Sequence, residues 1–368
     1  MPNRRRFLKI LGGGTILAAT GAVAFLATRT PHDALAPWTP KPYDDPRKTA
    51  LSYAILAPNP HNLQPWLVEL VGQDKVRIHR DADRELPETD PYHRQLYIGL
   101  GAFVETMVLA AGAQGFDTEV RILPDGNDGP IAEAVFVPDG APDPISDQIL
   151  KRHSNKEPYT EQRLSADQVS TLGDYATLIT DEDLVARIQE LTKRAFEIEM
   201  RTPQTLKESV DLMRIGKAEI NANPDGIELR DPMLETLRLS GLLDNETLMN
   251  IDHPGTQSHM RGYFAMLDAT PQYAVLATAT NTRSDQLDAG RQLMRFYLKT
   301  TEMGLGVHPV SQALQEYPEM ADEYALAHEL LASPGHTVQM LLRLGYGPEP
   351  IATARWPLET RILNEARG

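Results

Sequence analysis

The sequence has no cysteine among its 368 residues, and this absence removes several kinds of chemistry at once. Disulfide bonds, thiolate metal sites and thiol catalysis are excluded, while the redox state of the compartment stays open. The ten histidines lack the spacing of a zinc site. Neither a G-x-S-x-G elbow nor a Walker loop occurs, which argues against serine hydrolases and P-loop NTPases. We identify no catalytic residues and predict no metal site.

Basic residues are few relative to acidic ones. The chain has 36 lysines and arginines against 51 aspartates and glutamates, a net charge of −15, and 41% hydrophobic residues. An acidic surface without a basic stripe repels a phosphate backbone, so we expect no nucleic-acid partner. The length allows about two domains, or one domain with a long insertion, around a substantial core.

The N-terminal segment combines a basic cluster with an apolar run. Arg4, Arg5 and Lys9 precede residues 10–27, which carry no charge. The pattern resembles a twin-arginine export signal, and the small residues Ala22–Ala24 suit cleavage. An uncleaved membrane anchor is the alternative, because about 18 apolar residues can span a bilayer. We therefore predict export by the twin-arginine translocation machinery, to the periplasm or to the membrane surface, with membrane contact only through this segment.

Removal of residues 1–27, which hold four basic and no acidic residues, lowers the net charge from −15 to −19. The twin-arginine route carries proteins that have already folded, often with a cofactor inserted, so we expect a cofactor site in the rest of the chain. Residues 28–46 contain five prolines and are predicted to form an extended linker. A first unit is predicted over 47–144 and a second over 145–368, with an insertion at about 202–262.

Both units are predicted to be α+β. In the first unit the patterns predict helices and strands as follows: helices at 47–56 and 94–113, strands at 66–71, 76–80, 119–123 and 132–137. In the second unit they predict helices at 145–152, 166–176, 285–303 and 319–331, strands at 272–280 and 337–344, and a helical region over 181–250.

A corner between the first helix and the first strand carries the sharpest local signal. It places Pro58, Asn59, His61, Asn62 and Gln64 within seven residues. Prolines fix the backbone, while the amide side chains offer donors and acceptors in one short arc, which suits a flat ligand with a polar edge. The alternative is a rigid turn whose amides cap the preceding helix.

Cations are concentrated at the start of the second unit. Arg152, Ser154 and Lys156 alternate along the chain, so an extended segment would direct them to one side, as a phosphate monoester requires. Arg355 is a further candidate cation near the C-terminus. The alternatives are a solvated basic turn and a solvated surface arginine.

A glycine-rich turn follows the helix predicted over 285–303. Gly304 is explained as a helix cap, which leaves Gly306, after Leu305, for a close backbone approach to a ligand. A plain flexible turn is the alternative.

Together with the strand end Gly345–Gly347, these segments resemble the FMN-dependent nitroreductase superfamily, and more narrowly its exported or flavin-sequestering Acg-like branch. The resemblance implies an α+β sandwich that dimerises and holds FMN across the interface. In the family, one subunit supplies an R-x-S-x-R phosphate segment and the other supplies the proline-asparagine corner. Here the corner occurs only in the first unit and the phosphate segment only in the second.

We therefore predict two fused nitroreductase-like copies that form an internal pseudo-dimer with one FMN site. Asp44 and Asp45 stand where the first copy would carry its own phosphate segment, and acids there repel a phosphate. The resemblance assigns the predicted cofactor-binding residues in three groups. Arg152, Ser154, Lys156 and Arg355 would hold the phosphate; Pro58, Asn59, His61, Asn62 and Gln64 would line the ribityl chain and ring edge; Gly304, Leu305 and Gly306 would supply backbone near the pyrimidine.

The function implied is an FMN-binding oxidoreductase that passes electrons from a reduced donor to a small acceptor such as a nitroaromatic or a quinone. The flavin would do the chemistry, which agrees with the missing catalytic dyad. NAD(P)H is scarce outside the cytoplasm, so an exported enzyme would need another reductant. The alternative is a non-catalytic flavin-binding or flavin-sequestering protein in which the predicted insertion covers the ring.

Overall fold

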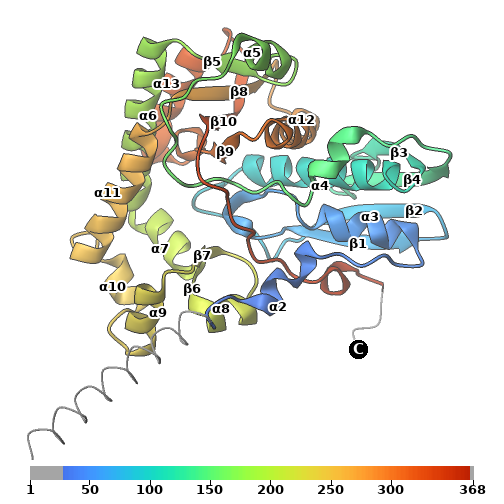
Figure 1. Cartoon of the computed structure of the whole chain (residues 1–368), viewed down its shortest axis with the longest axis horizontal. Coiled ribbons are helices and arrows are strands. Elements are labelled where there is room, and N and C mark those ends of the chain that lie inside the picture. The colour runs from blue at the N-terminus through green and yellow to red at the C-terminus, as the bar shows by residue number, and fades with distance from the viewer. Residues whose placement is uncertain (1–27, 365–368) are drawn as a thin grey trace, which may run out of the picture.

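The computed structural model describes residues 28–364, which form two four-stranded antiparallel sheets with helices packed on them (Figure 1). The α+β class expected from the sequence is confirmed. The export signal predicted for residues 1–27 lies outside the described residues.

The first sheet comes from the first half of the chain. Its strands stand in the order β1–β2–β4–β3. They are β1 (Trp66–Val71), β2 (Lys75–Arg80), β3 (Phe116–Ile122) and β4 (Ala132–Pro138). Helices α3 (Pro46–Ala54) and α4 (Arg94–Gly112) share one apolar core with this sheet. All six elements lie within a few residues of the predicted ranges.

The second sheet has the order β5–β8–β10–β9. Its strands are β5 (Thr177–Ile179), β8 (Gln272–Thr278), β9 (Gly306–Pro309) and β10 (Thr337–Gly345). Helices α5 (Ala166–Leu172) and α12 (Arg283–Glu302) belong to one apolar cluster, and α13 (Ala321–Leu331) belongs to another. Because both clusters include side chains of β8 and β10, these central strands are apolar on both faces. The helix predicted over 145–152 is a short 3-10 helix, η3 (Pro144–Gln148).

The two sheets repeat one topology. In each half the strands, taken in chain order, are arranged first, second, fourth, third, and a long helix separates the second from the third. The halves differ in one connection, because a short turn joins β1 to β2, whereas residues 180–271 lie between β5 and β8. That connection forms α6 (Glu182–Arg201), α7 (Pro203–Asp211), β6 (Met213–Ile215), α8 (Gly216–Ala222), β7 (Ile227–Leu229), α9 (Pro232–Leu239), α10 (Asn245–Met249) and α11 (Pro254–Asp268).

The long helices α4 and α12 cross at a pair of glycines. A side chain at Gly101 would overlap the carbonyl group of Leu287, and a side chain at Gly290 would overlap the carbonyl group of Ile98. On each helix, the carbonyl group that is approached belongs to the residue three positions before that helix's own glycine. The crossing is therefore reciprocal. Only glycine permits so close a backbone approach. Among the described helices, α4 alone is long and apolar enough to cross a membrane, but most of it is buried in this core.

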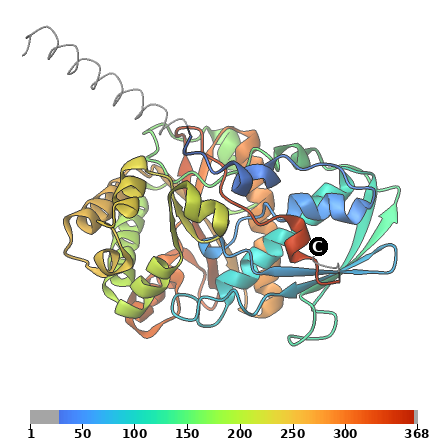
Figure 2. The same ribbon diagram turned by 90° about the horizontal axis from the view of Figure 1, so that it is seen from below.

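The two ends of the described chain lie in different places: the start lies beside α8 and α9 of the long connection, and the C-terminal end lies beside the first sheet (Figure 2). After β10 the chain crosses back, and Leu363 donates its backbone N–H to Val68 of β1. Residues 28–46 are not the extended tether that was predicted. They form α2 (His32–Leu35) and η1 (Ala36–Trp38), and the Trp38 indole donates to the carbonyl of Thr353 at 2.7 Å. The prediction was wrong because proline is favourable where a helix begins, as Pro37 shows in η1.

Candidate functional site

The predicted corner is a strained turn between α3 and β1. His61, Asn62 and Gln64 have φ angles of 48°, 54° and 55°, in the left-handed region that non-glycine residues rarely adopt. Such conformations cost about 1 kcal/mol or more each and persist where the surrounding structure holds them. The corner must therefore be fixed by contacts beyond its own sequence.

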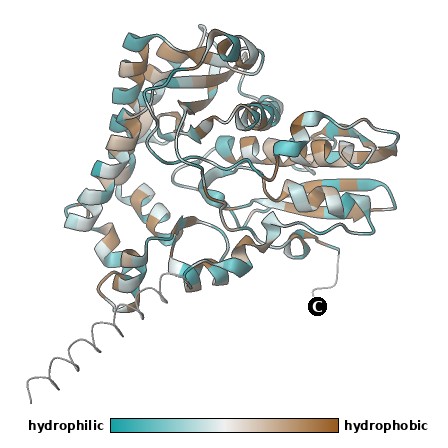
Figure 3. Cartoon of the chain, viewed as in Figure 1, coloured by the Kyte–Doolittle hydropathy of each residue, from teal (hydrophilic) through white to brown (hydrophobic). Residues whose placement is uncertain are grey.

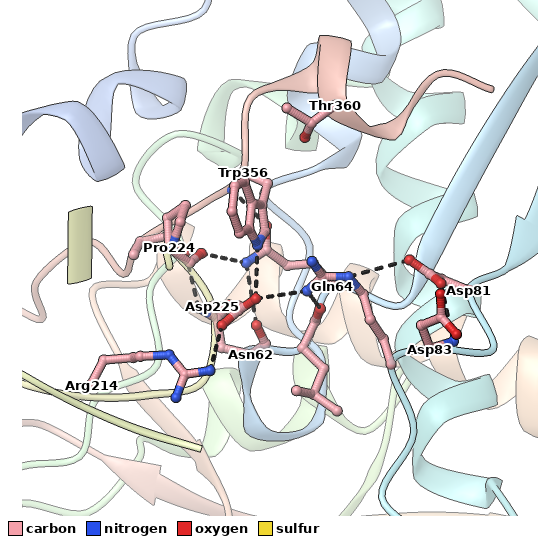
Figure 4. Close-up of polar contacts among 12 residues, drawn as sticks. Asn62, Gln64, Asp81, Asp83, Arg214, Pro224, Asp225, Trp356 and Thr360 are labelled. Carbon is pink, nitrogen blue, oxygen red and sulfur yellow. Dashed lines mark hydrogen bonds and ion pairs between the residues drawn. The ribbon is translucent and has the colours of Figure 1, made fainter. Parts of the chain in front are cut away.

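Gln64 supplies much of that fixing (Figure 4). Its side chain is fully buried; the amide N–H donates to the carbonyl of Pro224 at 2.7 Å, and the amide oxygen accepts from the backbone of Trp356 at 2.8 Å. The Asn59 side chain accepts from the Gln64 backbone at 2.7 Å. Asn62 donates to the carbonyl of Ala354 at 3.0 Å. These amides tie the corner to the long connection and to the C-terminal segment.

Asp225 is a second tie between the long connection and the rest of the chain, and the sequence analysis missed it. Its carboxylate accepts from the indole of Trp356 at 2.8 Å and pairs with Arg84 at 2.8 Å and Arg214 at 2.9 Å (Figure 4). Burial alone would raise the pKa of Asp225, but these donors outweigh it and the pKa is lowered. The long connection is thereby locked onto the corner.

Two buried guanidinium groups lie behind the corner. Arg152 and Arg355 are 2% and 3% exposed, and both donate to the carbonyl of Leu56, at 2.9 and 3.2 Å. Arg355 also donates to Asn62 at 2.6 Å. Burial lowers the pKa of both, and with the charge of Arg152 nearby that of Arg355 falls to about 9. The structure thus brings together residues 203 positions apart in the sequence, as predicted for a phosphate site.

This cationic pair has no carboxylate at ion-pair distance within the described chain, although the charge of Glu228 acts on Arg355 from farther away. Neither arginine forms an ion pair within residues 28–364, although an unpaired buried charge is strongly unfavourable. Arg152 Nε, Arg355 Nε and His153 Nδ1 are also buried without a hydrogen-bond partner there. Burial and the charges of the two arginines lower the pKa of His153 to about 3. Unpaired positive charge and unused N–H donors fit an anionic group such as a phosphate.

The charge of Lys156 acts on three imidazoles. The residue is exposed, yet desolvation of its ammonium group lowers its pKa. Burial, followed by the charge of Lys156, lowers the pKa of His61 to about 4. The same two causes lower the pKa of His259. The pKa of His308 is also lowered, mainly by burial, then by the charge of Arg343 and last by that of Lys156. Three imidazoles, from the corner, from α11 and from β9, therefore lie within the electrostatic reach of one cation.

Ser154 stands between the two cations in sequence and is held by an aromatic hydroxyl. Its Oγ lies 2.9 Å from the hydroxyl of Tyr297, and the Arg152 guanidinium lies 5.2 Å from the Tyr297 ring centre. Tyr297 projects from α12 and also donates to the carbonyl of Val307 at 3.3 Å. This tyrosine, which the sequence analysis missed, fixes the phosphate segment against the second sheet.

The glycine-rich turn over Gly304–Gly306 ends α12 and allows close packing. Gly304 has φ of 70° and ends α12, with Leu305 N–H bonded to the carbonyl of Thr300 at 2.9 Å, so its expected capping role is confirmed. A side chain at Gly306 would lie 2.9–3.0 Å from Asn155 and Tyr159. Leu305 is buried in the second half's core. The turn thus lets the phosphate segment pack closely, and its proposed backbone contact with a ligand stays a prediction.

Glu199, near the end of α6, belongs to a separate group of buried polar residues. Glu199 is 7% exposed, accepts from Gln315 at 3.2 Å and has no cationic partner among the described residues. Burial raises its pKa to about 7. Because the folded state then holds a proton that the unfolded chain releases near pH 4.5, Glu199 destabilises the fold as pH rises from about 4.5 to 7.

Glu199→Gln is accordingly expected to raise the free energy of unfolding at pH 8 and to change it little at pH 5. The difference follows from about 1.4 kcal/mol per pKa unit and amounts to roughly 2–3 kcal/mol. Denaturant titrations at both pH values measure it. The control is Glu197→Gln, on the same helix but in a largely exposed pair with Arg201. Parallel stability-against-pH profiles for wild type and Glu199→Gln would show that this carboxyl does not titrate as stated.

Two surface hollows lie elsewhere. One is lined by Tyr92, Asn281 and Glu316 among others and the other by Pro40, Ser52 and Pro357 among others; neither contains a predicted site residue. No group of three or more metal-ligating side chains is present in residues 28–364.

Comparison with known proteins finds similarity only among solved structures. No protein-family profile and no curated protein matches the sequence. A nitroreductase from Anabaena variabilis, described as putative, is 12% identical, covers 85% of this chain and 91% of its own, with a TM-score of 0.41. A nitroreductase-like protein from Bacillus cereus is 15% identical over 61% of this chain and 97% of its own, with a TM-score of 0.32. An FMN-dependent nitroreductase from Mycobacterium smegmatis, solved with NADPH, is 13% identical over 60% and 94%, with a TM-score of 0.33.

Proposed function

We propose that this chain is an FMN-binding oxidoreductase of the nitroreductase type, which passes electrons from a reduced donor to a small acceptor such as a nitroaromatic or a quinone. The observation that carries the proposal is the buried pair Arg152 and Arg355, which has no carboxylate partner within residues 28–364. FMN brings a dianionic phosphate, which is the charge that this pair lacks. When bound, FMN would supply the redox chemistry, and the protein would position it.

The chain's own residues take distinct parts in this proposal. Arg152 and Arg355 hold the phosphate, and Ser154, fixed by Tyr297, contributes a hydroxyl. Lys156 adds a charge from an exposed side chain, without the bidentate geometry of an arginine. The imidazole of His61 is left for the ligand, because the corner amides of Gln64, Asn59 and Asn62 are engaged with the protein itself.

The fold supports descent from two fused copies. Both halves repeat one strand order around one long helix, and those helices cross reciprocally at Gly101 and Gly290. A reciprocal contact is the signature of a two-fold interface between like subunits. We infer an internal pseudo-dimer in which the first half contributes the corner and the second half contributes the phosphate segment.

The related position in the first half is unsuited to a second flavin. Asp45 caps α3 and forms an ion pair with Arg47 at 2.7 Å, and Arg47 also donates to the carbonyls of Gly72 and Lys75. The positive charge of Arg47 is therefore already neutralised by Asp45. The proposal thus includes one FMN per chain.

Purified protein is expected to carry one flavin per chain. The measurement is the visible flavin absorbance against protein concentration, after reconstitution with excess FMN and removal of the unbound fraction. Two flavins per chain would contradict the assignment of one phosphate site to the second half, and no retained flavin would contradict the proposal as a whole.

A flavin-sequestering role is the second candidate, and the contacts of the long connection favour it. Gln64 and Asp225 lock that connection onto the corner, and His259 of α11 lies near Lys156. Such a cover would keep substrates from a bound ring. Anaerobic mixing of the flavin-loaded protein with NADPH, with dithionite as a small-reductant control, and then with a nitroaromatic separates the two. A flavin that bleaches with dithionite but neither bleaches with NADPH nor passes electrons to the nitroaromatic would favour sequestration.

We also propose that the protein is exported by the twin-arginine machinery, as in the Acg-like branch, and is periplasmic or anchored by an uncleaved N-terminal segment. The support is the sequence alone: the arginine pair Arg4 and Arg5 and the uncharged run over 10–27. Export of a folded protein agrees with a cofactor that must be inserted first. Fractionation of cells that express the chain with Arg4→Lys and Arg5→Lys tests it; unchanged export would contradict the route.

A further inference from the structure

Helix α9 and the turn after it expose large apolar side chains. Met233, Leu239 and Leu242 are 70%, 66% and 70% exposed, and they are the most exposed large apolar side chains of residues 28–364. Leu242 donates its backbone N–H to the carbonyl of Leu237 at 2.9 Å, which brings it beside the last turn of the helix. Leu237 in turn lies one helical turn after Met233. We call Met233, Leu237, Leu239 and Leu242 the α9 patch.

The described chain begins against the same helix. Arg29 pairs with Glu235 of α9 at 3.1 Å, and Lys217 donates to the carbonyl of Thr28 at 3.1 Å. Figure 1 shows α2, the first described helix, beside α8, and Figure 3 shows hydrophobic residues on α9. The residues that precede Thr28 in sequence are the uncharged run over 10–27.

We infer that the α9 patch is a lipid-binding surface that lies in the headgroup region of the bilayer when residues 1–27 anchor the protein. The inference rests on the anchored form proposed above. An apolar run of about 18 residues is long enough to span the hydrocarbon core, so in the anchored form residue 28 would leave the membrane at the headgroup level. The two contacts of Thr28 and Arg29 hold the α9 patch at that point.

The bilayer fits this surface better than an anionic partner or a distant protein. The body is strongly acidic, with a net charge of −19 once residues 1–27 are set aside, so attraction to anionic lipid does not hold it at the membrane. Apolar side chains beside a membrane anchor need little affinity of their own, because the anchor makes their insertion intramolecular. Insertion would fix the orientation of the body toward the membrane, from which a lipid-soluble acceptor could reach it.

The absence of cysteine makes a direct test available. Leu242→Cys is introduced into the full chain, with retention of residues 1–27 confirmed by mass, labelled with an environment-sensitive nitrobenzoxadiazole dye and reconstituted into phosphatidylcholine vesicles. Ile351→Cys is the matched control, since Ile351 is 63% exposed and lies outside the α9 patch. We expect a blue shift at position 242 and quenching by lipids spin-labelled roughly 5–10 Å below the surface, with neither at position 351.

A dye at position 242 that stays water-exposed in vesicles would overturn the inference. So would a blue shift that appears equally in detergent without lipid and grows with protein concentration, because a second copy of the chain would then cover the α9 patch. Flavin content, measured on the same samples, reports the proposed function separately. A second variant, Met233→Glu with Leu239→Glu, should abolish the shift of a dye at Ser240→Cys while the flavin content stays unchanged.

Discussion

Gly101→Ala is expected to lower the unfolding temperature of the protein by about 5 °C or more, whereas Gly262→Ala is expected to raise it. A Cβ atom at Gly101 would overlap the carbonyl group of Leu287 and approach the Cα of Gly290 to 3.0 Å. All three neighbouring atoms belong to the backbone of α12, so no rotamer change relieves the overlap. The helices must move apart, and the loss should reach the upper end of the roughly 1–3 kcal/mol typical of overpacked cores.

Gly262 is the matched control because it also lies inside a helix, α11, but is exposed and has no atom within 4 Å of the missing Cβ. Alanine there gains helix propensity worth up to about 1 kcal/mol and meets nothing. The two variants therefore isolate the crossing from the intrinsic effect of the substitution.

The reciprocal variant Gly290→Ala should behave like Gly101→Ala, and the double variant should cost less than the sum of the two. One outward shift of α12 from α4 relieves both overlaps, so the second substitution adds little. Thermal unfolding followed by circular dichroism measures all four proteins. Full additivity, or a single substitution without cost, would show that the two glycines do not share one helix crossing.

Local periodicity accounts for the part of the fold that the sequence predicted. Strands β1, β2, β3, β4, β8 and β10 and helices α3, α4, α12 and α13 lie near their predicted ranges, because each buries a continuous or alternating apolar pattern. Strands β5, β6 and β7 have three residues each and β9 has four, too few to establish a period. They are strands because their backbone groups complete a neighbouring ladder, which is a property of the assembled sheet.

The candidate site likewise has a part that the sequence predicts and a part that it does not. Alternating polar residues in one segment, such as Arg152 and Ser154, are visible in sequence. The partners that fix them are not: Tyr297 reaches Ser154 from another helix, and Asp225 joins three residues up to 141 positions away. The roles of Gly306, Gly345 and Gly347 also became clear only in three dimensions, since side chains there would meet the ring of Tyr159. Motifs indicate which residues matter, and packing decides whether a polar atom faces a ligand or the protein.

Arg152→Met is expected to weaken FMN binding strongly while leaving the flavin-free protein as stable as the parent, or more so. Arg152 is buried, unpaired in the described chain, and makes a single hydrogen bond, to the Leu56 carbonyl. Arg355 continues to donate to that carbonyl in the variant. Replacing an uncompensated buried charge with an apolar side chain of similar length is commonly neutral or stabilising.

The loss of FMN affinity should be large because the phosphate would lose a desolvated cation. Truncation of one partner of a buried charge pair costs about 2–5 kcal/mol, which corresponds to roughly 30-fold to several thousand-fold in the dissociation constant. Fluorescence titration of the flavin-free protein with FMN measures the constant, and thermal unfolding without FMN measures stability. Arg201→Met is the matched control, because Arg201 is exposed and pairs with Glu197 at 2.8 Å.

Opposite signs of the two effects distinguish a ligand site from a structural arginine. A purely structural Arg152 would lower stability on replacement and leave FMN affinity unchanged in the fraction that stays folded. A phosphate-binding Arg152 lowers affinity without lowering the stability of the flavin-free protein, and riboflavin, which lacks the phosphate, should bind the parent and the variant equally. If Arg152→Met weakens riboflavin and FMN to the same extent, the arginine contacts another part of the flavin or supports the corner, and the phosphate site must lie elsewhere.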